Sequence, residues 1–370
     1  MKFSISRNAF QELLQTVISA VPAKSTLPIL SNILVEADKE GLTLIATDLD
    51  ISIRTKGEAS VETGGSVTVP AKRIGEIARE LPDADVSVSV KDNKVKLTCE
   101  NGSYTIIGLD PEDFPQLPQV DAEKMVSIPH DILEKAVRRT TYSVSNDETR
   151  QMLTGALVQF KAGELRMVGT DGHRLAKAAF KGDFQGLEGR DLIIPPKALS
   201  QVVRLAAGHD KVNLFVSKNF AVFEVGPTTV YSRLIDGNFP NYEQVIPKES
   251  PKKFIMQRDE LVAVLRRVAI FSDSVTRQVK MSLKPERVEL SVSTADVGEG
   301  KETVGIDYSG EPLDIGYNAA YLLEALRTMS SDTVRISLNT PTSPGIVVPT
   351  EQKENEDLVC LIMPLRLPDA

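Results

Sequence analysis

The stretch Phe3-Ser-Ile-Ser-Arg-Asn-Ala-Phe-Gln-Glu-Leu-Leu14 opens the chain, and its pattern returns twice. The second copy, Val126-Ser-Ile-Pro-His-Asp-Ile-Leu-Glu-Lys-Ala-Val137, begins 123 residues further on. The third, Phe254-Ile-Met-Gln-Arg-Asp-Glu-Leu-Val-Ala-Val-Leu265, begins another 128 residues later. This period exceeds the roughly 20 to 50 residues of solenoid and propeller repeats. Each repeat therefore has the length of a whole domain.

The duplication continues at further landmarks, which follow one another in the same order. Three pairs of segments match at offsets of 123 to 125 residues: Leu44-Ile-Ala-Thr-Asp48 with Met167-Val-Gly-Thr-Asp171, Val67-Thr-Val-Pro-Ala-Lys72 with Leu192-Ile-Ile-Pro-Pro-Lys197, and Phe114-Pro115 with Phe239-Pro240. Looser third copies of the first two are Leu290-Ser-Val-Ser-Thr-Ala-Asp296 and Leu313-Asp-Ile-Gly-Tyr-Asn318. We predict three domains, at residues 1–122, 123–250 and 251–370.

Each repeat alternates strand-like and helical patterns. A short strand precedes an amphipathic helix, in which Phe10, Leu13, Leu14, Val17 and Ile18 follow helical spacing in the first copy. A second helix is predicted at 72–80, 197–206 and 318–329, directly after the Val-Pro or Ile-Pro strand or its third-copy counterpart. Alternating strands separated by tight turns fill the rest. This pattern predicts an α+β fold with mostly antiparallel sheets and two helices per repeat.

The composition fits a soluble globular protein: 41% of the 370 residues are hydrophobic and 25% are charged. No apolar run approaches the roughly 20 residues of a membrane helix, and the N-terminus lacks a signal-peptide core. Cys99 and Cys360 lie in strand-like runs and form no CxxC motif. We therefore expect a cytoplasmic protein with two reduced cysteines.

The sequence carries no recognisable catalytic or metal-binding motif. The three histidines, His130, His173 and His209, show no metal-ligand spacing, so we expect no metal and no cofactor. The polar run Thr170-Asp-Gly-His-Arg174 is open to two interpretations. Asp-Gly is a strong hairpin signal, so a structural turn lining a binding surface is one. A catalytic pair of Asp171 and His173, in a hydrolase or transferase, is the other.

The charge is unevenly distributed. The net charge of −8 argues against DNA binding, because DNA-binding proteins usually carry a basic footprint. The six predicted helices nevertheless sum to +5, which leaves −13 for the remainder. These helices are either ordinary solvated surfaces or a common, mildly basic lining suited to loose contact with a phosphate backbone.

Over essentially its whole length, the chain resembles the bacterial DNA polymerase III beta subunit family, the replicative sliding clamps. The resemblance rests on Met1-Lys-Phe3, Thr26-Leu-Pro-Ile-Leu30, Val69-Pro-Ala-Lys72, Thr170-Asp-Gly-His-Arg-Leu175, Phe239-Pro240 with Tyr242, and Met363-Pro-Leu-Arg-Leu367. It implies three similar domains per chain, and two chains joined head to tail in a ring around duplex DNA. It also implies an accessory subunit without a catalytic site. A closed ring needs little affinity per contact, which removes the objection raised by the acidic net charge.

The resemblance implies two sets of site residues. DNA contacts map onto Lys24, Lys72, Gln151, Met152 and Lys197. A pocket for short peptides of the replicative polymerase, the clamp loader and other partners with a clamp-binding motif maps onto Arg150, Leu153, Thr170, Gly172, His173, Arg174, Leu175, Pro240, Val245, Asn318, Tyr321, Ser343, Leu361, Met363, Pro364, Leu365 and Arg366. In this pocket, His173, Arg174 and Arg366 are expected to orient polar groups of the peptide. Pro368-Asp-Ala370 extends past the usual ending of the family.

The implied homodimer joins the first domain of one chain to the third domain of the other. We expect Ile270 and Phe271 to form an apolar contact there; the alternative is that Phe271 packs within its own domain. Three functions thus remain to be separated: a clamp around DNA, an enzyme using Asp171 and His173, and a scaffold that binds peptides but not DNA.

Overall fold

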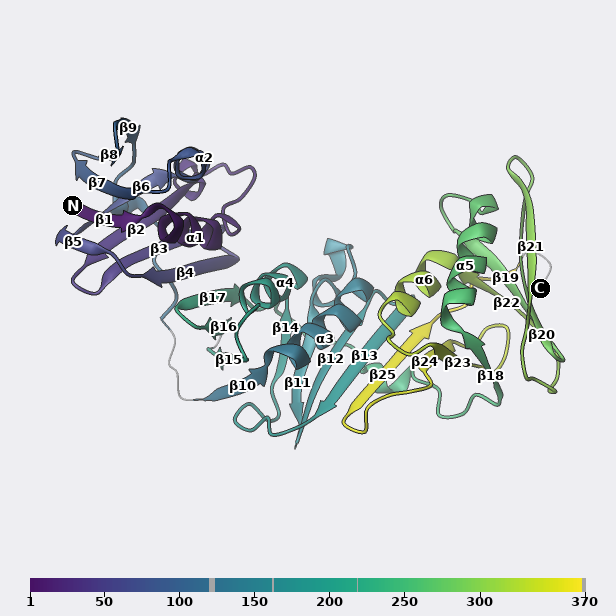
Figure 1. Cartoon of the computed structure of the whole chain (residues 1–370). Coiled ribbons are helices and arrows are strands. Elements are labelled where there is room, and N and C mark those ends of the chain that lie inside the picture. Colours follow the sequence, from purple (N-terminus) through teal and green to yellow (C-terminus); the bar gives the residue numbers. More distant parts are fainter. Residues whose placement is uncertain (120–123, 162, 218, 368–370) are drawn as a thin grey trace. The chain divides into compact units, whose positions relative to one another are not determined.

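The computed structural model describes residues 1–119, 124–161, 163–217 and 219–367 (Figure 1). The predicted domain boundary at 122/123 and the extension Pro368–Ala370 lie outside these residues. Contacts divide the chain into two compact units. The first unit comprises residues 1–131 and 197–234, and the second comprises 132–196 and the chain from 235 onward.

The first unit contains two antiparallel sheets. The five-stranded sheet has the order β5 (Ser60–Thr63), β1 (Lys2–Ser6), β7 (Asp85–Lys91), β8 (Lys94–Cys99) and β9 (Gly102–Ile107). The eight-stranded sheet has the order β10 (Met125–Pro129), β15 (Lys211–Val216), β16 (Phe220–Val225), β17 (Thr228–Arg233), β4 (Ile51–Gly57), β3 (Gly41–Thr47), β2 (Asn32–Asp38) and β6 (Gly65–Pro70). Its helices are α1 (Arg7–Ile18), α2 (Ala71–Glu80) and α4 (Pro196–Leu205), with short 3-10 turns η1 (Pro28–Ser31) and η2 (Pro111–Asp113).

The second unit repeats this plan. Its eight-stranded sheet has the order β14 (Asp191–Ile194), β11 (Ala156–Lys161), β12 (Glu164–Thr170), β13 (Arg174–Lys181), β25 (Glu356–Ile362), β24 (Gly345–Pro349), β23 (Thr333–Leu338) and β18 (Lys252–Gln257). The four-stranded sheet has the order β21 (Gly298–Gly305), β20 (Arg287–Thr294), β19 (Gln278–Lys284) and β22 (Leu313–Asn318). The helices are α3 (His130–Thr140), α5 (Arg258–Val268) and α6 (Ala319–Arg327), with turns η3 (Thr141–Ser143), η4 (Glu148–Leu153), η5 (Tyr242–Gln244) and η6 (Ala269–Phe271).

All six predicted helices are confirmed to within a few residues, and every strand pair among the described residues is antiparallel, which confirms the prediction of mostly antiparallel sheets. The helices form because one face of each is apolar: α1 buries Phe10, Leu13, Leu14 and Val17. Burying a side chain of this size contributes about 1.5–3 kcal/mol. Ser6 caps α1 by accepting a hydrogen bond from the Ala9 backbone nitrogen at 3.3 Å.

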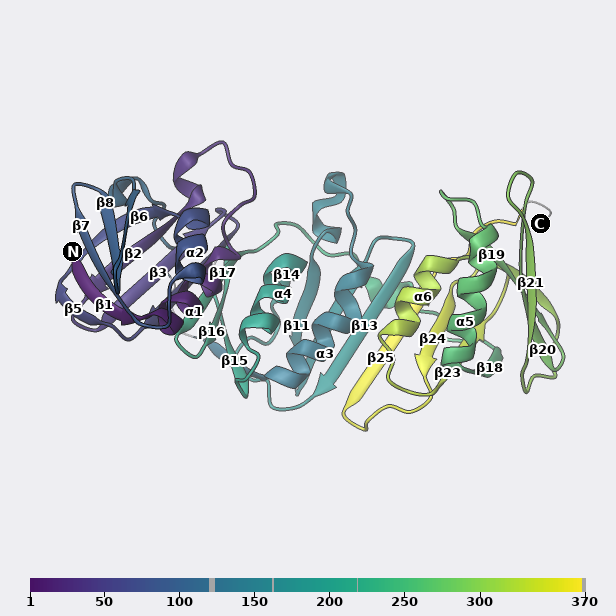
Figure 2. The same cartoon turned by 45° about the horizontal axis from the view of Figure 1, so that its top comes forward.

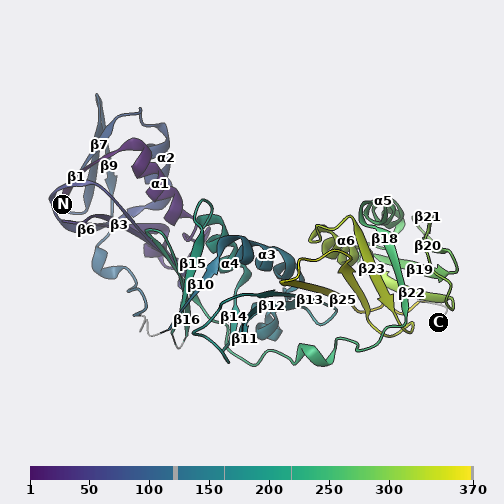
Figure 3. The same ribbon diagram turned by 60° about the horizontal axis from the view of Figure 1, so that its bottom comes forward.

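Within each unit, helices pack together on one side of the sheets. A Cβ added at Gly75 of α2 would stand 2.8 Å from Ile18 Cδ1 of α1, so the missing side chain lets these helices approach closely. In the second unit, α5 and α6 lie side by side, and α3 lies on the same side of the eight-stranded sheet (Figures 2 and 3). The sheets and helices therefore form two layers, as in other α+β folds.

The two compact units differ from the three predicted repeats, because each eight-stranded sheet joins strands of two consecutive repeats. Strand β17 of the second repeat pairs with β4 of the first, and β25 of the third pairs with β13 of the second. Each of β9, β17 and β25 is the last strand of a three-strand meander, as are β4, β13 and β21. Of these six described strands, β17 pairs with β4 and β25 pairs with β13, which leaves β9 and β21 at sheet edges.

Candidate functional site

The residues proposed to touch DNA fall in both units. Lys24, Lys72 and Lys197 are exposed in the first unit: Lys24 between α1 and η1, Lys72 in the first turn of α2, and Lys197 in the first turn of α4. In the second unit, Gln151 is exposed on η4, whereas Met152 packs against the buried cluster around Leu175. Lys197 is not a free cation, since its Nζ lies 2.5 Å from Asp48 Oδ2.

The run from Thr170 to Arg174 folds as the hairpin turn that the Asp-Gly pair predicted. Asp171 Oδ1 accepts hydrogen bonds from the backbone nitrogens of His173 (2.9 Å) and Arg174 (3.0 Å). The Thr170 hydroxyl donates to the Arg174 carbonyl oxygen at 2.6 Å. Gly172 has φ +89°, a left-handed conformation that glycine adopts without strain. The Asp171 carboxylate thus shapes the turn, and its other oxygen accepts from Arg174 Nε at 3.0 Å.

Arg174 lies at the centre of a dense set of contacts. Its guanidinium bonds Asp171, Glu324 and, at 2.8 Å, the Tyr142 carbonyl oxygen. The guanidinium carbon also stands 5.4 Å from the Tyr142 ring centroid and 4.3 Å from that of Tyr321, distances typical of cation–π contacts. Only 11% of the Arg174 side chain is exposed. Most of its binding capacity is therefore used inside the protein.

The half-buried Tyr142, which contacts Arg174, also bonds the buried Cys360. The Tyr142 hydroxyl donates to Cys360 Sγ at 3.4 Å. Burial raises the pKa of the Cys360 thiol to about 11 and also raises the pKa of the Tyr142 hydroxyl. Cys99 and Cys360 are both free and buried.

The apolar residues of the predicted peptide pocket fall into a buried set and an exposed set. Leu153, Leu175 and Leu361 are 6%, 3% and 2% exposed, whereas Val245 and Met363 are 50% and 37% exposed. Leu175 and Leu361 belong to one buried cluster with Leu157, Val168, Ile193 and Tyr242. The Tyr242 hydroxyl donates to Gln159 Oε1 at 2.9 Å, which anchors the segment carrying Pro240 and Val245 to the sheet.

Further contacts position the segments that carry the predicted pocket residues. The Met363 backbone nitrogen donates to the His173 carbonyl oxygen at 2.8 Å, so the C-terminal segment runs beside the turn. An added Cβ at Gly172 would stand 3.1 Å from Arg150 Nη1, so the Arg150 guanidinium lies over this glycine.

Asn318 caps α6 through its Oδ1, which accepts a hydrogen bond from the Ala320 backbone nitrogen at 2.9 Å. Pro364, Leu365 and Arg366 continue from Met363, and the Leu365 backbone nitrogen bonds the Gly316 carbonyl oxygen at 2.8 Å. Ser343 lies in the β23–β24 connection, where its backbone nitrogen bonds the Thr340 hydroxyl at 3.2 Å.

The two residues predicted at the dimer interface behave differently. Ile270 is 70% exposed on η6. Phe271 is half-buried, and its ring lies over β21: an added Cβ at Gly300 would stand 2.6 Å from the ring. Phe271 thus contacts its own repeat, and both the exposed part of its half-buried side chain and Ile270 can meet another surface.

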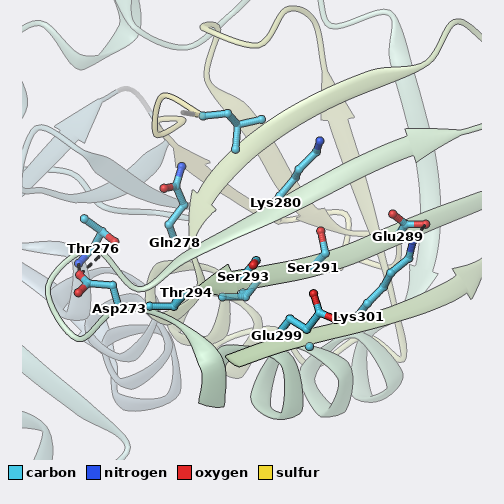
Figure 4. Close-up of a pocket in the computed structure, with 13 residues that line it drawn as sticks. Asp273, Thr276, Gln278, Lys280, Glu289, Ser291, Ser293, Thr294, Glu299 and Lys301 are labelled. Atoms are coloured by element: carbon cyan, nitrogen blue, oxygen red, sulfur yellow. Dashed lines mark hydrogen bonds and ion pairs between the residues drawn. The ribbon is translucent and has the colours of Figure 1, made fainter. Parts of the chain in front are cut away.

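Two hollows were not anticipated from the sequence. One, of about 910 Å³, lies between α2 and β9 and is lined by Pro70, Lys72, Arg73, Glu76, Ile77, Thr105, Ile106 and Ile107. The other, of about 730 Å³, lies over β19, β20 and β21 and is largely polar (Figure 4). Its Lys280 pairs with Asp314 at 2.8 Å and its Lys301 pairs with Glu289 at 2.9 Å. Neither lysine is an unpaired cation.

In the described parts of the chain, no cluster of His, Cys, Asp or Glu could hold a metal ion. None of the helices there is long and apolar enough to cross a membrane.

Comparison with known proteins gives a consistent result over the whole chain. Three family models match: the DNA polymerase III beta subunit N-terminal domain at residues 1–118, its central domain at 127–241 and its C-terminal domain at 243–366. The beta sliding clamp of Chlamydia muridarum is 32% identical over 370 residues, covering 100% of both chains. That of Caulobacter vibrioides is 35% identical over 376 residues, covering 99% of this chain and 100% of its own.

Solved structures agree with these sequence matches. A beta sliding clamp from Caulobacter crescentus superimposes with a TM-score of 0.94 at 34% identity, over 99% of this chain and 100% of that one. A sliding clamp from Pseudomonas aeruginosa, solved bound to griselimycin, has a TM-score of 0.92 at 29% identity, with the same coverage.

Proposed function

Because the chain belongs to the DNA polymerase III beta subunit family, the replicative sliding clamps, we propose that it closes with a second copy around duplex DNA through the surfaces described above. Members of this family are processivity factors of DNA replication and not enzymes in their own right. We assign the repeats to residues 1–122, 123–250 and 251–370. The role in replication, together with two free, buried cysteines, favours a cytoplasmic protein.

The observation that carries ring closure is the pair of unpaired strand edges. Two equivalent junctions are formed within the chain, β17 with β4 and β25 with β13. They share one register, because Tyr231 lies opposite Ser52 and Leu361 lies opposite Leu175. Leu175 follows Ser52 by 123 residues, the offset between the first two repeats. The strands that would form a third junction are β9 and β21. Since exposed strand edges invite pairing with another chain, we assign the β9 edge of one copy to the β21 edge of its partner.

The internal equivalence also gives the register of this third junction. Successive cross-strand pairs connect Phe3 to Val88, Val88 to Leu97 and Leu97 to Tyr104. The corresponding pairs of the second repeat connect Val126, the counterpart of Phe3, to Val230. Because Val230 lies opposite Ile53, Tyr104 should lie opposite the third-repeat counterpart of Ile53.

That counterpart is Gly300. Val67 and Ile315 each lie four residues before the second helix of their repeat. Successive strand pairs connect Val67 to Thr55 through Val35 and Leu44, and they connect Ile315 to Glu302 through Met281 and Leu290. Thr55 thus corresponds to Glu302. Ile53 therefore corresponds to Gly300. Tyr104, which is 41% exposed, would lie opposite the partner subunit's Gly300, close to the partner's Ile270. Phe271 already covers Gly300 within each copy, so Tyr104 would pack against the partner's Phe271, and aromatic pairs across strands stabilise a sheet.

Replacing Ile270 tests this interface. Ile270→Asp should raise the dimer dissociation constant at least about ten-fold, because a charge would be buried without a partner. Ile255→Asp is the matched control, since Ile255 is 53% exposed on β18, away from β9 and β21. Sedimentation velocity over a dilution series measures both; equal dissociation of the two variants would contradict the assigned interface.

Lys24, Lys72, Lys197, Gln151 and Met152 are our proposed DNA contacts. The support is the exposure of the first four and the absence of any ion pair on Lys24 and Lys72 within the described residues. Loose, sequence-independent contact needs only a modest cationic lining. Closed circular DNA should retain the protein in gel filtration, and linearising the DNA should release it. Equal retention on both forms would exclude a ring, and no retention would favour a peptide scaffold.

The second proposed site is the pocket for the clamp-binding peptides of the polymerase, the clamp loader and other partners. The support is a set of buried leucines, Leu153, Leu175 and Leu361, together with the exposed Val245, Met363, His173 and Arg366 and the half-buried Arg150. Methionine adapts its shape to varied ligands. Met363→Ala should weaken binding of a fluorescein-labelled clamp-binding-motif peptide, whereas the control Met125→Ala, at a residue 47% exposed on β10, should not. Unchanged affinity in Met363→Ala would remove Met363 from the pocket.

A further inference from the structure

The proposed peptide pocket has two walls that come from different repeats. One is the turn carrying Gly172 and His173, between β12 and β13. The other is the start of α6, with Asn318 as its cap and Tyr321 in its first turn. A peptide held between them depends on their spacing, because a displacement of about 1 Å is enough to weaken a preorganised site.

Arg174 joins these two walls. On the turn side, its Nε donates to Asp171 Oδ2 at 3.0 Å, and its own backbone nitrogen bonds Asp171 Oδ1 at 3.0 Å. On the helix side, Nη1 donates to Glu324 of α6, and the guanidinium stacks on Tyr321 with 4.3 Å from its carbon to the ring centroid. Nη2 reaches the Tyr142 carbonyl oxygen at 2.8 Å. The planar fork of arginine suits such divergent contacts, which lysine cannot reproduce.

We infer that Arg174 is a positioning residue, which sets the spacing of the pocket walls through Glu324 rather than by binding the peptide. This inference rests on the proposed function of the pocket. It replaces the sequence-based expectation that Arg174 orients polar groups of the peptide. The reason is burial: 11% of the Arg174 side chain is exposed, against 40% for Glu324, so the ion pair is shielded on the arginine side.

A neighbouring ion pair at the same junction supplies a matched control. Lys177 of β13 pairs with Asp357 of β25 at 2.8 Å, and their side chains are 17% and 53% exposed. Like Arg174 and Glu324, these residues join the second repeat to the third. Neither lies on the turn or on α6, so losing this pair removes a junction contact without touching either pocket wall.

A double-mutant cycle on peptide affinity tests the inference. Glu324→Gln and Arg174→Lys should each weaken binding of the fluorescein-labelled clamp-binding-motif peptide by roughly five-fold, and the double variant should lose no more than either alone, because residues that act as one unit are not additive. Asp357→Asn should leave the affinity unchanged. Urea unfolding of all four variants shows whether a variant that binds the peptide more weakly is also less stable. General destabilisation alone would not produce non-additive losses of peptide affinity.

Two results would overturn the inference. If Arg174→Lys weakens binding while Glu324→Gln does not, Arg174 contacts the peptide directly. If the losses of Arg174→Lys and Glu324→Gln add, the two residues act separately. Failure of the pocket itself looks different: the wild-type protein would then not bind the peptide, or Met363→Ala would bind it as tightly as wild type.

Discussion

Lys197 Nζ lies 2.5 Å from Asp48 Oδ2, so a lysine assigned to the DNA phosphates is already held by a carboxylate of the preceding repeat. The lysine side chain is 55% exposed and Asp48 only 13%. Asp48 also shapes its own turn, since its Oδ1 accepts from the Ile51 backbone nitrogen at 2.7 Å. Part of the positive charge of α4 is therefore neutralised within the protein.

Removing the Asp48 charge should release Lys197 for DNA. Asp48→Asn keeps an acceptor for the turn but loses the ion pair. We expect the slope of log affinity for a short linear duplex against log salt to steepen by roughly one. Lys197→Ala should cost less affinity than Lys72→Ala, since Lys72 has no ion pair within the described residues. Fluorescence anisotropy between low and moderate salt measures both; an unchanged slope in Asp48→Asn would show that Lys197 contacts no phosphate.

Tyr317 carries a buried hydroxyl that has no hydrogen-bond partner among the described residues. The residue is 1% exposed, and burial raises the pKa of its hydroxyl. Tyr317→Phe should therefore leave the free energy of unfolding unchanged or raise it by about 1 kcal/mol, because a desolvated polar group is removed. Tyr242→Phe is the control and should cost about 1 kcal/mol, because the Tyr242 hydroxyl bonds Gln159 at 2.9 Å. A clear loss of stability in Tyr317→Phe, followed by urea unfolding, would refute the prediction.

Glu356 should make the stability of the second unit depend on acid pH. Its burial raises the carboxyl pKa, but hydrogen bonds and ion pairs with Arg139 (2.7 Å) and Lys135 (3.1 Å) outweigh burial, and the net pKa lies below the ordinary value. A lowered pKa means that this stabilisation is complete above the unfolded pKa, near 4.5, and is lost as the pH falls through the folded value.

The matching variant is Glu356→Gln. It leaves the Arg139 guanidinium, whose side chain is 8% exposed, without its carboxylate, and should cost about 3 kcal/mol at neutral pH. Urea midpoints measured from pH 7 to pH 3 should fall less steeply for Glu356→Gln than for the wild type. Parallel curves would mean that Glu356 does not contribute to the acid sensitivity.

Leu49 and Gly172 occupy equivalent turns but only one of them is a glycine. Leu49 has φ 78° and Gly172 has φ 89°, both left-handed. A leucine in this region is strained by about 1 kcal/mol or more, whereas asparagine tolerates it better. Leu49→Asn should raise the thermal midpoint, and Gly172→Ala should lower it, since its added Cβ would also stand 3.1 Å from Arg150 Nη1. Opposite signs in calorimetry are the expected result; a stabilising Gly172→Ala would be the contrary one.

Much of the fold could be predicted because its signals are local. The apolar spacing of Phe10, Leu13 and Leu14 predicted α1, and Asp171-Gly172 predicted the hairpin turn, since both depend only on residues close in sequence. Repetition then carried each prediction to the other copies. The site was harder to predict, because the side chains that hold it come from distant segments. The sequence did not indicate that Arg174, expected at the pocket, bonds Glu324, or that Phe271, expected at the dimer interface, covers Gly300 of its own repeat.

The sequence by itself determined that the chain contains three related units, which elements each unit forms, and which residues resemble the family's sites. Only the tertiary structure decided that β17 pairs with β4 and β25 with β13, so that the compact units cut across the repeats. It alone decided that Lys197 is paired with Asp48 while β9 and β21 keep free edges. The physical reason is that strand pairing and ion pairing join residues more than a hundred positions apart, where no spacing in the sequence reports which partners meet.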